Sequence, residues 1–433
     1  MLAAGDASLG VRVQVPRAAA VYLGIVQFFF ALTWMVYVTF LPQLLDPYGI
    51  ERSTLIWFLI GDQLVFAIAD VATGISVDRV GRTIGRLGPL IAAITAISCL
   101  TFLLLPQVAL AGAIGGPALF LGITAIWAVS SSALRAPAWV LLMKYAAVPS
   151  VPWLSALSIA GLALASIATP YVVTVLRDQD PRLPFALASA SLLATVAGLI
   201  WVERAILNQP RTGDTAAVTS ASSSGLTREA RALAAAPPSL FTLFLASGAL
   251  LFLGFQAHVS FNSAGQYLRF VEPDQLDWLF PIFWVGFNIL MFPAMIVSER
   301  SGALPVMIWS ALVGSVGAVI ASLAPSLELT ILGQVVCGAG WGGVLMAGFT
   351  GALALGREGR EGLSLGLWFS IQAMAALTRM GLVAAQLNRS SDFLALTTWV
   401  PPALWLVSAA LLAVLIVFTV RRTEAAPSMG SMA

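Results

Sequence analysis

Long apolar stretches recur along the whole chain, separated by short polar segments. Each is close to the ~20 residues of helix that span a bilayer core of about 30 Å. Helix is the expected form, because an unpaired backbone polar group in lipid costs several kcal/mol. Short junctions at Pro106, at residues 148–152 and at Pro325 leave eleven or thirteen spans as alternatives. We predict twelve spans, which begin near Ala18, Thr54, Gly88, Pro117, Val151, Leu183, Leu240, Leu276, Ala303, Leu329, Leu363 and Leu394.

The longest polar segment divides the twelve stretches into two sets of six. It is rich in Ser, Thr, Ala and Arg, which predicts a cytoplasmic linker with a short surface helix near residues 228–235. The predicted organisation is an N-terminal segment at 1–17, a six-helix bundle at 18–202, the linker at 203–238, a second six-helix bundle at 239–420 and a tail at 421–433.

The composition excludes an ordinary soluble protein. Of the 433 residues, 59% are hydrophobic and 10% are charged, and the mean hydropathy is +0.93, whereas soluble domains carry about 25% charged residues. The net charge of +2, without a basic tract, argues against a nucleic-acid partner. Cys99 and Cys337 lie inside apolar stretches, so no disulfide framework is expected. The first stretch is too long for a cleavable signal peptide and is expected to be a span.

Basic residues are distributed unevenly between alternate loops. If both termini lie inside, the inner segments hold fifteen Arg and Lys residues and the outer loops hold five. Because basic residues are enriched in cytoplasmic loops, we expect both termini in the cytoplasm. Arginine supplies 21 of the 22 basic residues. That bias is typical of a GC-rich bacterial source, so we expect the bacterial cytoplasmic (inner) membrane.

The connection after the second stretch carries glycines, an aspartate and arginines at fixed spacing. Gly74, Asp78, Arg79, Gly81 and Arg82 follow the pattern Gly, three residues, Asp-Arg, one residue, Gly-Arg. The first glycine permits close approach of another helix. The aspartate can accept hydrogen bonds from a neighbouring helix N-terminus, and the arginines can anchor the loop at the membrane surface. A degraded copy follows the eighth stretch, in the second half of the chain.

This loop resembles the signature of the major facilitator superfamily (MFS), and a repeat suits the two related halves of such transporters. The resemblance implies an all-α polytopic membrane protein with twelve transmembrane helices in two six-helix bundles. It also implies a latch between the halves in the outward-open state, and a monomer. From Asp70 the spacing is similar to the glycoside–pentoside–hexuronide:cation symporter branch. Phe66 replaces the second carboxylate of that branch, which favours a proton over sodium as the coupling ion.

Four ionisable residues lie well inside predicted spans: Asp62, Asp70, Arg135 and Arg379. Each would cost at least ~2.5–3.5 kcal/mol if it faced lipid unpaired, so we expect them to face protein, water or one another. The resemblance implies that the second and eleventh spans face each other across the two halves, so the matching depths of Asp62 and Arg379 predict an outer gate between them. The depths of Asp70 and Arg135 predict a second pair. It is either a static ion pair that holds the bundle together or a proton-coupling site in which the arginine tunes the pKa of the carboxylate.

By analogy with the family, the first, fourth, seventh and tenth spans line a central cavity. Amides and aromatic faces there suit a small polar organic solute, either sugar-like or an organic anion. The alternatives are membrane-interface anchors and ordinary packing residues. The candidate cavity residues are Gln27, Trp34, Tyr37, Trp127, Gln256, His258, Gln334 and Trp341.

Enzymatic activity is not expected, because His, Cys and carboxylates do not cluster at catalytic spacing and no phosphate-binding loop occurs. His258 is the only histidine, so no metal site and no cofactor are expected. The leading hypothesis is a secondary active transporter, a symporter with H⁺ as the coupling ion. The alternatives are an uncoupled facilitator, an efflux pump, and a membrane assembly or pigment-delivery factor on the same fold.

Overall fold

The structure is a computed structural model that describes residues 17–51, 54–83, 88–111, 116–143, 151–176, 178–207, 225–234, 238–355 and 359–425. These residues form helices joined by turns, and they contain no β-strand. The all-α class predicted from the apolar stretches is therefore confirmed.

The first bundle holds the first six spans. The fourth span consists of two helices joined by the short 3-10 turn Ser132–Leu134, and the sixth consists of two helices that meet at Gly198. The helices are α1 (Arg17–Leu45), α2 (Leu55–Thr83), α3 (Gly88–Leu110), α4 (Gly116–Ser131), α5 (Ala136–Met143), α6 (Val151–Leu176), α7 (Arg182–Ala197) and α8 (Leu199–Leu207).

The second bundle follows the linker, in which α10 (Gly225–Ala234) is the described helix. A π-helical turn, His258–Asn262, interrupts the seventh span. The helices are α11 (Pro238–Ala257), α12 (Ser263–Tyr267), α13 (Leu276–Ser301), α14 (Ala303–Leu323), α15 (Leu327–Leu355), α16 (Glu361–Ala384), α17 (Ser391–Thr397) and α18 (Val400–Ala425).

Twelve segments of the described chain are long and apolar enough to cross a membrane. Their first residues lie within three positions of the predicted starts. The agreement has a simple cause, because bilayer thickness sets the length of each apolar stretch locally.

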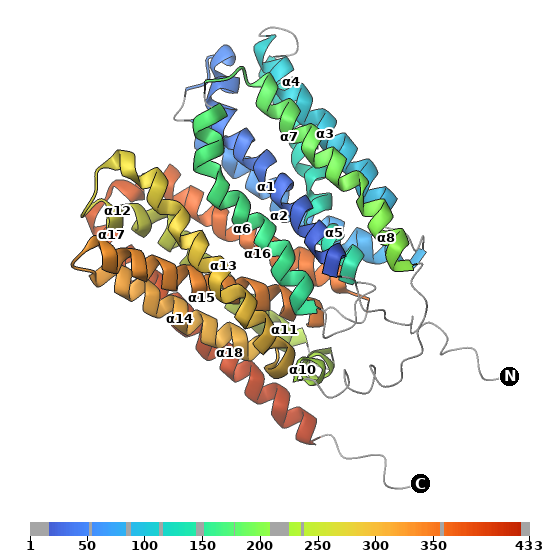
Figure 1. Cartoon of the computed structure of the whole chain (residues 1–433), viewed down its shortest axis with the longest axis vertical. Helices are drawn as coiled ribbons and strands as arrows, with labels where there is room; N and C mark the ends of the chain where they lie inside the picture. Colours follow the sequence, from blue (N-terminus) through green and yellow to red (C-terminus); the bar gives the residue numbers. More distant parts are fainter. Residues whose placement is uncertain are drawn as a thin grey trace, which may run out of the picture.

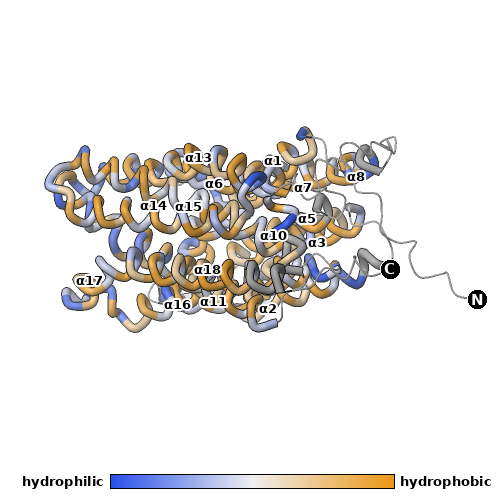
Figure 2. Tube along the Cα trace, turned by 90° about the horizontal axis from the view of Figure 1, so that it is seen from below, coloured by the Kyte–Doolittle hydropathy of each residue, from blue (hydrophilic) through white to orange (hydrophobic). Residues whose placement is uncertain are grey.

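The two bundles lie side by side, converging near α5, α10 and α11 and diverging toward α4 and α12 (Figure 1). We call the end that carries α10 the linker end and the opposite end the far end. Hydrophobic positions cover most of each membrane-spanning helix, and hydrophilic positions gather at helix ends and connections (Figure 2). This distribution is the one expected when lipid surrounds the middle of the molecule.

The bundles meet along several helices, and two helix pairs make the longest contacts between them. α2 packs along α16, and α6 packs along α13, so the second and eleventh spans face each other as the resemblance implied. At the linker end a Cβ atom on Gly74 would overlap the carbonyl oxygen of Gly362. The two backbones touch there, and only glycine permits this approach.

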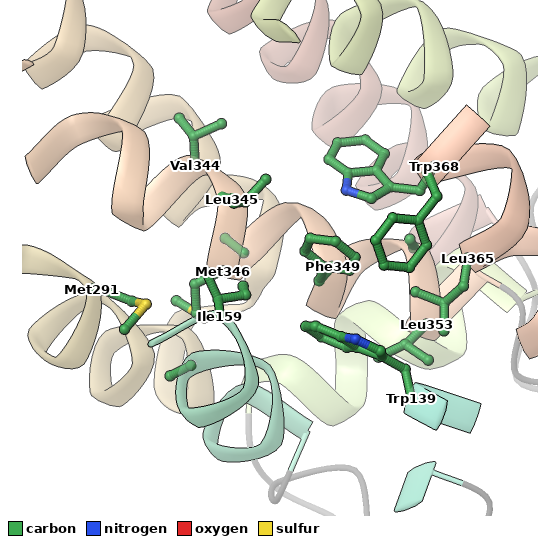
Figure 3. Close-up of a cluster of buried hydrophobic side chains, with 14 of the residues drawn as sticks. Trp139, Ile159, Met291, Val344, Leu345, Met346, Phe349, Leu353, Leu365 and Trp368 are labelled. Atoms are coloured by element: carbon green, nitrogen blue, oxygen red, sulfur yellow. The ribbon is translucent and has the colours of Figure 1, made fainter. Parts of the chain in front are cut away.

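Buried aromatic side chains fill the bundle interface at the linker end (Figure 3). Trp139 of α5 stacks on Phe349 of α15 with ring centroids 4.3 Å apart, and Trp368 of α16 packs against the other side of this group. These residues belong to one core that contains side chains from both bundles. The far half of the first bundle has a core of its own, which agrees with bundles that separate toward the far end.

Candidate functional site

The fourth span is broken at the depth where the candidate site lies. Pro137 lacks a backbone N–H and its ring collides with the preceding helical turn, so α4 gives way to a 3-10 turn before α5 begins. The break frees the carbonyl oxygen of Leu134. Gln27 of α1 satisfies it, donating from Nε2 at 2.7 Å. Broken helices that are repaired by side chains in this way are typical of functional sites in transporters.

The break presents Arg135 to Asp70 of α2. Arg135 Nε lies 3.0 Å from Asp70 Oδ1, with the side chains 16% and 0% exposed. Their depths predicted this pairing, and the structure brings the two together. The guanidinium also lies 5.2 Å from the ring centre of Phe66 and 4.8 Å from that of Phe369, distances typical of cation–π contacts.

Phe369 belongs to α16, so the ion pair lies at the interface between the bundles. The same helix crosses the backbone of Asp70, where a Cβ atom on Gly366 would overlap the carbonyl oxygen of Asp70. The pair is held within one bundle, but one wall of its pocket comes from the other. A movement of the bundles apart at the linker end therefore changes the surroundings of this pair.

Asp78 ties the two bundles one turn beyond Gly74. Its Oδ1 accepts a hydrogen bond from the Gly362 N–H at 2.7 Å, and its Oδ2 accepts one from the Leu363 N–H at 2.9 Å. Both donors lie at the N-terminus of α16, where unpaired N–H groups and the helix dipole favour a negative charge. Gly81 and Arg82 continue α2, and their side chains lie outside the described part of the structure.

Two further carboxylates at the linker end were missed by the sequence analysis. Glu203 of α8 accepts a hydrogen bond from the Gly88 N–H at the start of α3, at 3.0 Å. Glu229 of α10 accepts one from the Leu304 N–H at the start of α14, also at 3.0 Å. The predicted linker helix is thus bound to the second bundle. An acidic residue near the start of a predicted linker helix is the signal that could have suggested this cap.

The Glu229 contact is expected to depend on pH. Burial raises the pKa of Glu229 from 4.5 to about 7, although the backbone N–H groups at Leu304 and Ala303 oppose this. A raised pKa means that docked α10 holds its proton more tightly than undocked α10 does. The stabilisation is complete below pH 4.5 and is lost as pH rises through 7.

We therefore expect α10 to undock more readily at pH 8 than at pH 5, by at least about tenfold, since one pKa unit corresponds to a factor of ten. Hydrogen exchange of residues 225–234, corrected for the intrinsic pH dependence, measures this. Glu229→Gln keeps an acceptor oxygen and should show no such change. Equal pH dependence in both proteins would refute the assignment to Glu229.

The predicted partners Asp62 and Arg379 are not joined in this structure. The Tyr37 hydroxyl donates to Asp62 Oδ2 at 2.8 Å, and Arg379 Nε is buried without a hydrogen-bond partner. Neither of the two ion pairs found in the described chain joins them. Both residues lie toward the far end, where the bundles diverge, so the predicted gate would require the far ends to approach.

The eight candidate cavity residues differ in exposure. Trp34 and Gln256 are half-buried, and the other six are at most 2% exposed. Packing explains several of them. Trp127 stacks on Trp34 with ring centroids 6.1 Å apart, and Trp341 stacks on Phe255 at 4.4 Å. Their role in solute binding stays a prediction.

Polar side chains form a buried chain inside the second bundle, beside the π-helical turn. His258 Nε2 lies 3.0 Å from Gln334 Oε1, Gln334 Nε2 donates to Gln266 at 2.7 Å, and Gln266 donates to Ser322 at 3.0 Å. Gln266 and Ser322 were not predicted, because nothing local in the sequence connects them to His258. No group of three His, Cys, Asp or Glu side chains suited to a metal ion occurs in the described ranges.

The chain has the fold of the major facilitator superfamily. A bacterial homologue of the iron transporter ferroportin, in an outward-facing state, superposes with a TM-score of 0.70 at 14% identity, over 92% of this chain and 99% of that one. The MFS proton:xylose symporter XylE gives 0.64 at 13%, over 91% and 94%. The human organic anion transporter MFSD10 (TETRAN) gives 0.63 at 16%, over 92% and 100%. No protein-family model and no curated sequence matches this chain.

Proposed function

We propose that the protein is a secondary active transporter that moves a small polar organic solute by alternating access, with H⁺ as the coupling ion. The observation that carries the proposal is the buried ion pair of Asp70 and Arg135 beside a broken helix. Buried charges inside a membrane are costly and mark ion and substrate pathways in transporters. The structural neighbours named for proton-coupled sugar transport and for organic anion transport have the same fold.

The interface supports a coupling role for this pair. In the arrangement described here, α16 covers Asp70 and places Phe369 over Arg135. Separation of the bundles at the linker end would remove that cover and admit water to the carboxylate. Protonation of Asp70 would then weaken its attraction for Arg135, and deprotonation would restore it. The closed linker end and the separated linker end would thus favour different protonation states of Asp70.

A single carboxylate favours a proton over sodium. Phe66 lies one turn from Asp70, and its ring packs on Arg135 instead of supplying an oxygen ligand. Na⁺ needs several oxygen ligands, whereas a proton needs one carboxylate. By the distribution of basic residues, the linker end would face the cytoplasm of a bacterium, and the closed latch would correspond to an outward-open state.

Two classes of solute fit the residues of the far half. A neutral sugar-like solute would use the amide and aromatic side chains, and an organic anion would use Arg379, which has no ion-pair partner among the described residues. A cavity of about 310 Å³ at the far end is lined by α1, α6 and α13 and is large enough for a small solute. Arg379 is not among its lining residues and its charged lining residue is Asp277, so this cavity suits a neutral solute better than an anion.

The test is a thermal-shift screen of the purified protein against sugars, organic acids and amphipathic drugs at pH 5.5 and pH 7.5. A ligand that binds only the folded state raises its apparent stability. We expect a hit whose affinity depends on pH in the wild type and not in Asp70→Asn. A hit with equal affinity at both pH values would favour an uncoupled facilitator. No hit, together with a co-purifying protein, would favour an assembly factor.

A further inference from the structure

A groove runs between α2 and α4 in the far half of the first bundle, away from the ion pair. Its volume is about 440 Å³, within the usual range for small-molecule sites. Its walls are largely apolar and include Trp57 and Phe58 of α2 and Leu121 and Ala125 of α4. Asp62 is the acidic residue among its lining residues.

The groove opens on the apolar outer surface of the bundle. Trp57, Leu64 and Ile68 are 60%, 48% and 65% exposed, and together with Gly61 they follow the spacing of a single helix face. An apolar face of this kind is the one that lipid covers. Trp57 and Gly61 belong to both the face and the groove, so the groove is open to the membrane.

Asp62 is a buried carboxylate with one partner. Asp62 is 6% exposed, and the Tyr37 hydroxyl donates a hydrogen bond to its Oδ2. Among the described residues Oδ1 receives no hydrogen bond, and no Arg, Lys or His is paired with the carboxylate. A buried carboxylate that lacks a cation at the edge of an apolar groove is complementary to a ligand that brings its own positive charge.

We propose that this groove binds an amphipathic organic cation that enters from the membrane, with Asp62 as its counter-ion and Trp57 and Phe58 against its body. Aromatic faces beside a carboxylate are the chemistry that recognises quaternary cations. This binding goes beyond the proposed transport function and does not depend on it.

The depth of Asp62 selects this occupant over a phospholipid amine. Asp62 lies seven residues beyond Leu55, the first residue of α2, which corresponds to roughly 10 Å along the helix. A lipid ammonium group would have to leave the headgroup region and lose its hydration to reach it. A cation whose charge is spread over aromatic groups is weakly hydrated and reaches that depth at less cost.

The probe is radiolabelled tetraphenylphosphonium, and equilibrium binding to the full chain in detergent is measured. We expect saturable binding to the wild type. In a separate assay the tetraphenylborate anion, which has the same shape and the opposite charge, should show no saturable binding. Asp62→Asn keeps the size and an acceptor for Tyr37 but removes the charge, and it should weaken binding by roughly thirtyfold or more.

A second variant tests the place of binding. Nothing lies within 4 Å of a Cβ atom added at Gly61, so Gly61→Leu fills the groove without disturbing the fold and should also weaken binding by at least about tenfold. Gly381→Leu is the matched control, because a Cβ atom there also meets open space on an exposed part of α16. It should bind like the wild type.

Three results would overturn the proposal. The first is no saturable binding to the wild type. The second is wild-type affinity in Gly61→Leu, which would place the cation elsewhere even if Asp62→Asn loses it. The third is equal loss in Gly381→Leu, which would show that added bulk acts indirectly. The melting temperature of each unliganded variant identifies any loss that comes from unfolding.

Discussion

Replacing Arg135 with glutamine is expected to lower the free energy of unfolding by about 3–5 kcal/mol, the usual cost of removing one partner of a buried ion pair. The cause is the carboxylate that stays behind. Asp70 is 0% exposed and has Arg135 as its ion-pair partner. Without the guanidinium, Asp70 must either stay charged in an apolar interior or take up a proton, and both cost free energy.

The double variant Arg135→Gln/Asp70→Asn separates this effect from lost packing. It leaves no buried charge, so it should recover most of the stability that the single variant loses. Asp70→Asn is the other single variant, and unfolding of the four detergent-solubilised proteins, followed by tryptophan fluorescence, completes the cycle. If Arg135→Gln is as stable as the wild type, or if the double variant is no more stable than the single one, the ion pair does not stabilise the fold.

Arg135→Lys refines the test. It keeps the charge but loses the flat guanidinium that packs between Phe66 and Phe369. Lysine and arginine are not equivalent at a stacked site. We therefore expect a stability between those of the wild type and Arg135→Gln.

Replacing Asp78 with alanine is expected to open the linker end. The carboxylate accepts two backbone hydrogen bonds from the N-terminus of α16, and a hydrogen bond to a charged group contributes about 1.5–3 kcal/mol. Loss of even one such bond changes the ratio of closed to open molecules by roughly tenfold or more. Asp78→Asn keeps an oxygen that accepts one bond and should have a smaller effect.

Cysteine labelling can measure this opening, because the native residues Cys99 and Cys337 are both buried. Ser155 is 0% exposed and receives a hydrogen bond from Thr350 of the other bundle at 3.3 Å. In an Asp78→Ala background, Ser155→Cys should react faster with a water-soluble maleimide. Ser189→Cys is the control, since Ser189 is buried within the first bundle, where its hydroxyl donates to the carbonyl oxygen of Cys99.

Removing an exposed acid elsewhere should leave labelling unchanged. Asp180 lies in an exposed ion pair with Arg182 at 3.9 Å, and surface pairs of this kind contribute little. If Asp180→Ala raises the labelling of Ser155→Cys as much as Asp78→Ala does, or if neither raises it, the latch does not control the linker end.

Much of the candidate site could be predicted. The cost of an unpaired charge in lipid identified Asp62, Asp70, Arg135 and Arg379 from the sequence alone. Comparison of depths paired Asp70 with Arg135. The depths did not reveal the hydrogen bond from Tyr37 to Asp62 or the packing of Phe369 on Arg135. The depth of a residue in the membrane does not say which face of its helix the residue occupies.

The sequence by itself determined the twelve spans, the division into two halves and the presence of a carboxylate able to cap a helix at Asp78. Each follows from a local constraint, namely bilayer thickness or the spacing of a short motif. Only the tertiary structure decided which groups meet. Asp78 and the Gly362 N–H are 284 positions apart, and Glu229 reaches α14 across 75. Such contacts depend on how whole helices pack, which is set by many small steric fits that no short segment contains.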